Sequence, residues 1–134
     1  MKKIGLLACL CITAALAAQN DPLRYVNPFI GTGGHGHTFP GAAAPWGMAQ
    51  VSLDTRINML DWDACSGYHF SDSALYGFSH THLSGTGVAD YGDILLLPFV
   101  GKTETDPQRY VTPFDKKTER AEAGYYSVQL SKHR

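Results

Sequence analysis

Apolar and polar residues alternate with a period of two in three short stretches of the chain. These stretches are residues 49–53 (AQVSL), 76–79 (YGFS) and 126–130 (YSVQL). Because successive side chains of a strand point to opposite faces, this alternation predicts strands with one buried face. The strand that starts at Tyr76 would, if it continued, place Phe78, His80 and His82 on one face.

Other patterns complete the predicted set of elements. Residues 94–97 (ILLL) form a continuous apolar run, which predicts a strand buried on both faces. Residues 67–70 predict another short strand, and residues 116–123 predict a short helix that stops at Gly124. Glycine (14 residues) and proline (7 residues) separate most of these elements. Short strands joined by turns, without repeats, predict an all-β fold, specifically an antiparallel β-sandwich.

The last predicted strand extends almost to Arg134, and no closing turn follows it. A strand pattern that stops in this way leaves an unpaired edge. We therefore expect residues 18–134 to form a sandwich that is incomplete at the C-terminus, as the N-terminal piece of a longer protein.

The first residues have the features of an export signal. Lys2 and Lys3 precede an apolar run at 4–16, and the small residues at 15–17 (ALA) form a cleavage site. The run is too short for a transmembrane helix. We therefore expect residues 1–17 to be a signal peptide and the mature protein to be periplasmic or secreted.

Charge and cysteine content exclude several other classes. Lys and Arg number 11 against 12 Asp and Glu, so the chain has no basic field for nucleic acid. Cys9 and Cys11 lie in the predicted signal peptide, which leaves Cys65 alone and without an intrachain disulfide partner. We interpret Cys65 as a small buried residue rather than a reactive thiol.

Histidines and glycines are concentrated in two segments that could line a binding site. The histidines form two His-x-His pairs, His35 with His37 and His80 with His82. Residues two apart on a strand share a face, so each pair could chelate a transition metal, with Asp90 or Asp93 as a further ligand. Histidines in glycine-rich loops also bond backbone or a ligand, and this alternative remains open.

A second cluster suggests a carbohydrate. Trp62 and Asp63 lie just before Tyr68 and His69. Aromatic rings pack against the apolar faces of sugars, and carboxylates and imidazoles bond the hydroxyls. The alternative is a buried core tryptophan, although its two aspartate neighbours favour water. Hydrolysis of a glycoside needs two carboxylates beside the bond, and the pattern of aspartates does not single out an acid and a base.

Several motifs, in order along the chain, resemble the start of glycoside hydrolase family 92. They are 25–32 (YVNPFIGT), the His35/His37 loop, 45–48 (PWGM), 66–69 (SGYH), 77–87 (GFSHTHLSGTG) and 92–94 (GDI). The resemblance implies the N-terminal β-sandwich of a larger two-domain enzyme, followed in the family by an (α/α)₆ catalytic barrel, with the active site between the two domains. It also implies a secreted or periplasmic, calcium-dependent, inverting exo-α-mannosidase, often α-1,2-specific, that degrades mannose-rich N-glycans or mannans.

The resemblance also implies which domain carries each kind of functional residue. The acid, the base and the calcium ligands are expected mainly in the barrel, so this chain alone should contain no catalytic residue and be inactive. Contacts with mannose are expected from residues in or just before these motifs: Trp62, Asp63, Cys65, His80, His82, His35 and His37. Two other functions remain open from the residues: a stand-alone carbohydrate-binding module, and a metal-binding β protein that uses the His-x-His pairs.

Overall fold

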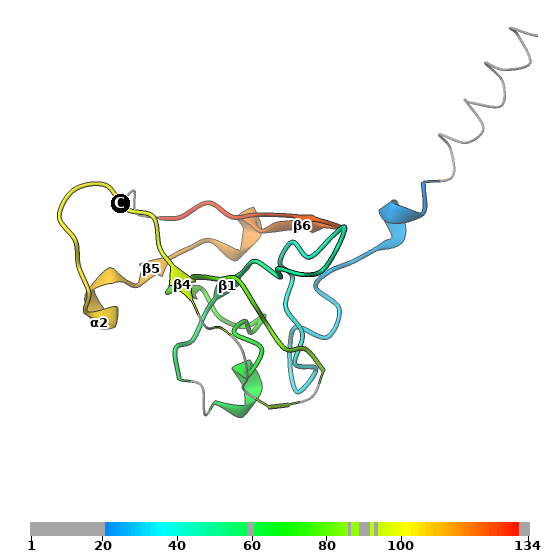
Figure 1. The fold of residues 1–134 in the computed structure, drawn as a ribbon, viewed down its shortest axis with the longest axis horizontal. Coiled ribbons are helices and arrows are strands. Elements are labelled where there is room, and N and C mark those ends of the chain that lie inside the picture. The colour runs from blue at the N-terminus through cyan, green and yellow to red at the C-terminus, as the bar shows by residue number, and fades with distance from the viewer. Residues whose placement is uncertain (1–20, 59–60, 86, 89–91, 93, 132–134) are drawn as a thin grey trace, which may run out of the picture.

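The computed structural model describes residues 21–131, except for 59–60, 86, 89–91 and 93. The predicted signal peptide, residues 1–17, lies outside this part of the chain, as do Asp90 and Asp93. Within the described residues, no helix has both the length and the apolar character needed to cross a membrane. The pairings between the described strands are antiparallel, which confirms the predicted all-β class with antiparallel sheets (Figure 1).

The largest described sheet has three strands in the order β1 (Ser52–Asp54), β3 (Gly77–Ser79) and β4 (Leu95–Leu96). Phe78 in the central strand lies opposite Leu53 on one side and Leu96 on the other. Strand β3 coincides with the predicted strand at 76–79, but it ends at Ser79, before His80 and His82.

Two smaller sheets contain the other described strands. They are β2 (Ala74–Leu75) with β5 (Thr112–Pro113), and the hairpin of β6 (Arg120–Glu122) with β7 (Tyr125–Ser127). The hairpin turns at Gly124, whose φ of +78° is a conformation that glycine adopts without a Cβ clash. The predicted strand at 126–130 is confirmed at 126–127 only, and beyond β7 Leu130 forms an isolated bridge with Phe114.

Short helical segments connect the strands, and an aspartate precedes each one that the structure describes. They are η1 (Pro22–Tyr25), η2 (Trp62–Ala64), α2 (Pro107–Tyr110) and η3 (Lys116–Thr118). The side chains of Asp21, Asp61, Asp106 and Asp115 each accept a bond from the backbone N–H two residues later. Aspartate favours this position because its carboxylate satisfies an amide that has no partner within the helix.

The apolar core of the described residues is small. Leu53, Tyr68, Leu75 and Phe114 are buried together, and a shell of partly buried apolar residues surrounds them: Phe29, Phe39, Phe78, Leu97, Tyr126, Val128 and Leu130. So few fully buried side chains supply little hydrophobic stabilisation. Polar contacts must therefore hold much of the chain in place.

One such contact is the Glu119 clamp, which consists of Glu119, Lys116, Tyr68 and Tyr126. The Glu119 carboxylate accepts bonds from the hydroxyls of Tyr68 (3.1 Å) and Tyr126 (2.6 Å), and Lys116 Nζ lies 2.7 Å from its other oxygen. Burial, with the nearby carboxylate, raises the pKa of both tyrosines above its ordinary value. The clamp fixes the β6–β7 hairpin to the core.

Several sequence-based predictions were wrong in detail. Residues 67–70 form no strand, and within 116–123 the structure has the short η3 followed by strand β6. A helix across 116–123 would move Glu119 away from Tyr68 and Tyr126. The tertiary contacts of the clamp therefore override the local helical pattern.

Burial also differs from the prediction in two strands. Residues 94–97 were predicted to be buried, yet β4 is exposed, with Leu96 at 60%. At 49–53, Leu53 is buried as expected, but Val51 is exposed and Ser52 is buried, so the residues of β1 are all buried instead of alternating. The reason is that both faces of β1 are covered, because Leu53 packs in the apolar core while Asp54 accepts bonds from Ser79.

We predict that Glu119→Ala lowers the free energy of unfolding by about 3 kcal/mol, because it leaves a lysine and two phenols without their shared acceptor. Urea unfolding monitored by circular dichroism measures this loss. Glu122→Ala, an exposed change in the same hairpin, should cost under about 0.5 kcal/mol. Equal losses for the two variants would show that the clamp does not hold the hairpin.

Candidate functional site

Four of the residues predicted to contact a sugar lie together at the surface. We call His35, His37, Trp62 and Asp63 the Trp62 group. His35 Nδ1 lies 2.7 Å from Asp63 Oδ1. The rings of His37 and Trp62 meet edge to face, with their centroids 4.7 Å apart. The group therefore joins two segments, the glycine-rich loop at 31–37 and helix η2.

The two aromatic members of this group differ in exposure. Trp62 is 57% exposed, so the predicted alternative of a buried core tryptophan is wrong. His37 is 6% exposed and has a φ of +52°, which is unusual for a residue with a Cβ. Its Nε2 is buried and makes no hydrogen bond within the described part of the chain. A strained backbone and a buried nitrogen without a partner are both more common at functional sites than elsewhere.

A third segment packs against the Trp62 group. The backbone N–H of Gly85 donates to the carbonyl of His37 at 2.6 Å. A Cβ on Gly87 would lie 2.5 Å from Trp62 Cη2 and 3.0 Å from the His37 ring. Glycine at position 87 therefore permits a close approach that any other residue would prevent.

His82 lies elsewhere, in a buried polar network. Its Nδ1 is 2.7 Å from the carbonyl of Gln50, and its Nε2 is 2.9 Å from Ser79 Oγ and 3.4 Å from Asp54 Oδ1. Ser79 in turn donates both its backbone N–H (2.8 Å) and its hydroxyl (2.7 Å) to Asp54. Both ring nitrogens of His82 are occupied and its side chain is 2% exposed, so the structure does not bring it to the Trp62 group.

The two remaining predicted residues are less accessible than Trp62. Cys65 is buried directly after helix η2, as predicted, and burial raises the pKa of its thiol. It is therefore a neutral thiol rather than a nucleophile at neutral pH. His80 is half-buried, and its Nδ1 makes no hydrogen bond within the described residues.

Arg56 positions the site, and the sequence pattern did not identify it. Its Nε and Nη2 donate to the two oxygens of Asp72 at 2.7 and 2.9 Å, and its Nη1 donates to Asp61 at 2.8 Å. Asp61 also caps helix η2 by accepting the backbone N–H of Asp63. Arg56 therefore fixes the start of the helix that carries Trp62. Arg56 and Asp72 are 16 positions apart in the sequence, and no local pattern connects them.

These bonds change the acidity of the two carboxyls. Bonding to Arg56 holds the pKa of Asp61 below its ordinary value. Burial acts to raise the pKa of Asp72, but the bonds from Arg56 and Thr55 outweigh it and the net shift is downward. Both groups are therefore ionised at neutral pH, and neither suits the role of a general acid.

The described residues do not provide a calcium site. Calcium binds six to eight oxygen ligands, typically with several carboxylates. Within the described part of the chain, no three or more His, Cys, Asp or Glu side chains are grouped so that they could hold a metal ion. Both ring nitrogens of His82 already have partners, which does not support the metal-binding hypothesis for the His80/His82 pair.

Comparison with known proteins identifies the family of the chain. The sequence profile of the glycosyl hydrolase family 92 N-terminal domain matches residues 25–134. The chain therefore belongs to glycoside hydrolase family 92, where it corresponds to the N-terminal domain, as the motifs indicated.

Relatives of known structure belong to the same family. A family 92 α-mannosidase of Bacteroides thetaiotaomicron, solved in complex with mannoimidazole, is 41% identical with a TM-score of 0.73, over 81% of this chain and 15% of that enzyme. An inverting family 92 mannosidase of the same organism is 33% identical with a TM-score of 0.64, over 81% of this chain and 15% of that enzyme.

A fungal relative is named as a glycosidase without a stated family. An uncharacterized secreted glycosidase of Arthroderma benhamiae is 31% identical over 90% of this chain and 16% of its own length. The chain therefore spans about one sixth of the length of the relatives it matches.

We predict that Arg56→Leu removes about 2 kcal/mol of stability at pH 7, since bonds to charged groups contribute about 1.5–3 kcal/mol. The carboxyl pKa values are depressed in the folded state, so their contribution is complete above the unfolded pKa of about 4 and is lost as pH falls through the folded values. Urea unfolding between pH 7 and 2 should show the two proteins converging in acid. Arg120→Leu is the exposed control, and a constant difference at every pH would contradict the assignment.

Gly87→Ala should displace Trp62, because its Cβ would overlap the indole. We expect a loss of about 2–3 kcal/mol and a changed Trp62 fluorescence spectrum, measured in a Trp46→Phe background. Gly85→Ala is the matched control. Its φ is also positive, but a Cβ there meets nothing within 4 Å, so only backbone strain of about 1 kcal/mol is expected. An unchanged Trp62 spectrum in Gly87→Ala would count against this packing.

Proposed function

We propose that this chain forms the sugar-contacting wall of a secreted or periplasmic exo-α-mannosidase. The observation that carries the proposal is the Trp62 group: an exposed indole beside an imidazole–carboxylate pair and a buried ring nitrogen without a bond. An indole packs well against the C–H face of a sugar, and charged or polar groups at its edge bond the hydroxyls. Family membership makes mannose the substrate class that fits best.

Each member of the group has a distinct role in this proposal. Trp62 supports the apolar face of the mannose ring, while His35 and Asp63 bond hydroxyls at its edge. His37 holds the indole through its edge-to-face contact. We propose further sugar contacts from Cys65, which directly follows helix η2, and from His80, and a supporting role in the interior for His82, which bonds Gln50 and Asp54.

The chemical step is proposed to take place in an (α/α)₆ catalytic domain that is not part of this chain. Glycoside hydrolysis needs one carboxyl that is protonated and a second that acts as a base or nucleophile. Asp61 and Asp72 are both held ionised by Arg56, so neither can supply the proton. We propose an inverting, calcium-dependent reaction, often at α-1,2 linkages of mannose-rich N-glycans or mannans, with the metal bound mainly by the catalytic domain.

The further proposals concern the limits of the domain and its location. We propose that residues 1–17 are a signal peptide and that residues 18–134 belong to the N-terminal β-sandwich domain. The fungal relative that is named as secreted supports export.

A second candidate function is a stand-alone carbohydrate-binding module. The Trp62 group favours it because the indole is already exposed and its neighbours are already placed in the isolated chain. The two functions share one binding site and differ in whether the chain acts alone or with a catalytic domain.

Calorimetry with mannose and α-1,2-mannobiose at millimolar concentration tests the site. We expect weak binding that Trp62→Ala abolishes, because stacking on an aromatic ring supplies most of the contact. Asp63→Asn should weaken it about tenfold through loss of a charge-assisted bond, which is worth about 1.5 kcal/mol. Tyr125→Ala, which removes a similarly exposed aromatic on β7, is the control and should bind normally.

The same purified chain should release no mannose from mannobiose. Release of mannose would contradict the proposal that the acid and base lie outside the chain. Binding heat that is the same in Trp62→Ala and the unmodified chain would contradict the assignment of the site.

A further inference from the structure

His69 connects the bonds of Arg56 to the glycine-rich loop that carries His35. Its backbone N–H donates to Thr55 Oγ1 at 3.0 Å, and the Thr55 hydroxyl donates to Asp72 at 2.8 Å. Asp72 is in turn held by the guanidinium of Arg56. The position of the His69 backbone is therefore set by the same carboxylate that Arg56 fixes.

The imidazole of His69 extends from this anchor to the loop. Its Nε2 lies 3.3 Å from the carbonyl oxygen of Gly34, the residue directly before His35. Its Nδ1 accepts the backbone N–H of Ser71 at 3.3 Å and lies 2.8 Å from the Ser71 hydroxyl. Because an amide N–H can only donate, Nδ1 carries no proton in this arrangement. The neutral ring therefore carries its proton on Nε2 and donates it to Gly34.

The loop needs contacts from outside, because its own backbone is costly to order. Four of the residues at 31–36 are glycines, and glycine loses more conformational freedom on folding than any other residue. The pair of His35 and Asp63 gives little help, since these side chains are 73% and 43% exposed and exposed ion pairs contribute little stability. The N–H of Phe70 also donates to the carbonyl of Thr32, at 2.8 Å. His69 and its neighbour therefore hold the part of the loop directly before His35.

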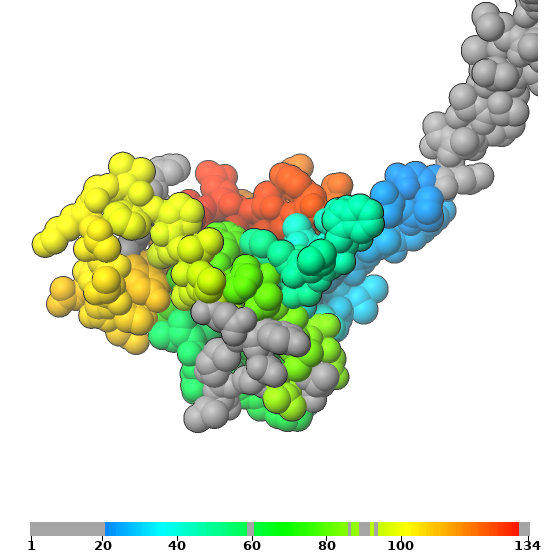
Figure 2. Space-filling model, viewed as in Figure 1, coloured from blue at the N-terminus to red at the C-terminus, as the bar shows by residue number. Residues whose placement is uncertain are grey.

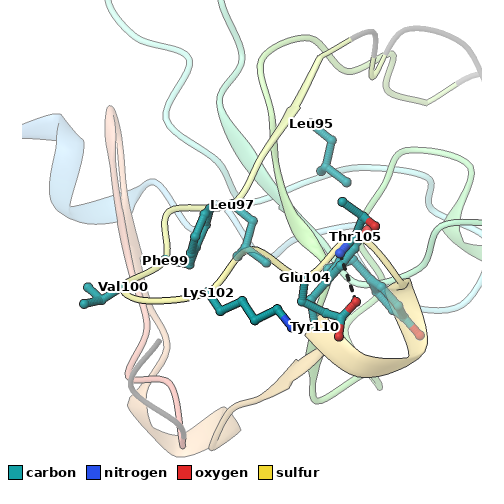
Figure 3. Close-up of a pocket in the computed structure, with 9 residues that line it drawn as sticks. Leu95, Leu97, Phe99, Val100, Lys102, Glu104, Thr105 and Tyr110 are labelled. Atoms are coloured by element: carbon teal, nitrogen blue, oxygen red, sulfur yellow. Dashed lines mark hydrogen bonds between the residues drawn. The ribbon is translucent and has the colours of Figure 1, made fainter.

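A cavity elsewhere in the chain does not contribute to this arrangement. It has a volume of about 460 Å³ and lies beside strand β4 and helix α2, with Leu97, Phe99 and Tyr110 in its lining (Figure 3). None of its lining residues belongs to the Trp62 group. In Figure 2 the yellow segment that lines it lies on the other side of the view from the light-blue segment that leads into the glycine-rich loop. The placement of His35 therefore depends on bonds from its own neighbours rather than on the walls of this cavity.

We propose that His69 is a positioning residue of the sugar site. Its Nε2–H holds Gly34 so that His35 meets Asp63 beside Trp62. In this arrangement His69 acts through His35 rather than on the sugar itself. The role of His69 in sugar binding rests on the proposed function, whereas its effect on the pair of His35 and Asp63 does not.

Imidazole nitrogen magnetic resonance of the isotope-labelled chain tests the tautomer without any substitution. At about pH 8.5 an ordinary imidazole is neutral. We expect the proton of the His69 ring on Nε2 and none on Nδ1. A proton on Nδ1 would overturn the proposal, because the neutral ring would then have no donor for the carbonyl of Gly34.

Two substitutions separate the hydrogen bond from the shape of the ring. His69→Gln keeps an N–H donor at a similar reach, whereas His69→Phe keeps a planar ring and removes the donor. In each background, the ring signal of His35 is compared before and after Asp63→Asn. We expect Asp63→Asn to move that signal in the unmodified chain and in His69→Gln, and to leave it in place in His69→Phe, where the pair is already broken. Equal movement in all three backgrounds, or its loss in His69→Gln, would overturn the proposal.

Calorimetry with mannose measures the consequence for binding. We expect His69→Phe to weaken mannose binding about fivefold, the effect of losing one ordinary hydrogen bond, and His69→Gln to bind like the unmodified chain. Unchanged affinity in His69→Phe would overturn the role of His69 in sugar binding. An unmodified chain that binds no mannose, yet shows the expected His69 tautomer and the expected response of His35, would contradict the proposed function and leave the positioning of His35 standing.

Discussion

The bonds from Arg56 to Asp72 and Asp61 connect the parts of the molecule on which the candidate site depends. Arg56 follows strand β1, Asp61 caps helix η2, and Asp72 precedes strand β2. One guanidinium therefore fixes the sheet and the helix that presents Trp62 relative to each other. The planar group bonds Asp72 through two nitrogens and Asp61 through a third, an arrangement that lysine could not reproduce.

This dependence on polar contacts follows from the small core. The cluster of four buried side chains among the described residues cannot hold a chain in which most of the backbone lies in loops and turns. The Glu119 clamp, the Arg56 bonds and the network of Asp54, Ser79 and His82 take over that role. Each network is satisfied by specific geometry, so each fixes one arrangement of the loops, whereas apolar packing alone would tolerate several. A rigid arrangement suits the proposed sugar-contacting wall, because side chains that are already in place lose less conformational entropy on binding.

The sequence predicted the class of fold and much of the site, for reasons that are local. Alternation at 76–79 identified β3, and the residues around Trp62 have side chains whose chemistry suits sugars wherever they fold. It failed where distant parts of the chain decide the outcome. The pairing of Arg56 with Asp72, the burial of His82 away from His35 and His37, and the strand at Arg120–Glu122 all depend on tertiary contacts that no local period reveals. The prediction of a buried strand at 94–97 failed for a different reason. A continuous apolar run is typical of a strand that is covered on both faces, but β4 is exposed among the residues that the structure describes.

These features together define one candidate binding surface. The Trp62 group is the surface that we propose faces the sugar. The central claim is that mannose binds at Trp62, and nuclear magnetic resonance of the isotope-labelled chain tests it directly. The chain has two tryptophans, so two indole N–H signals are expected. Titration with mannose should shift the signal of Trp62, with those of residues 35–37, and leave that of Trp46 unchanged. A shift confined to Trp46, or none at saturating mannose, would contradict the account.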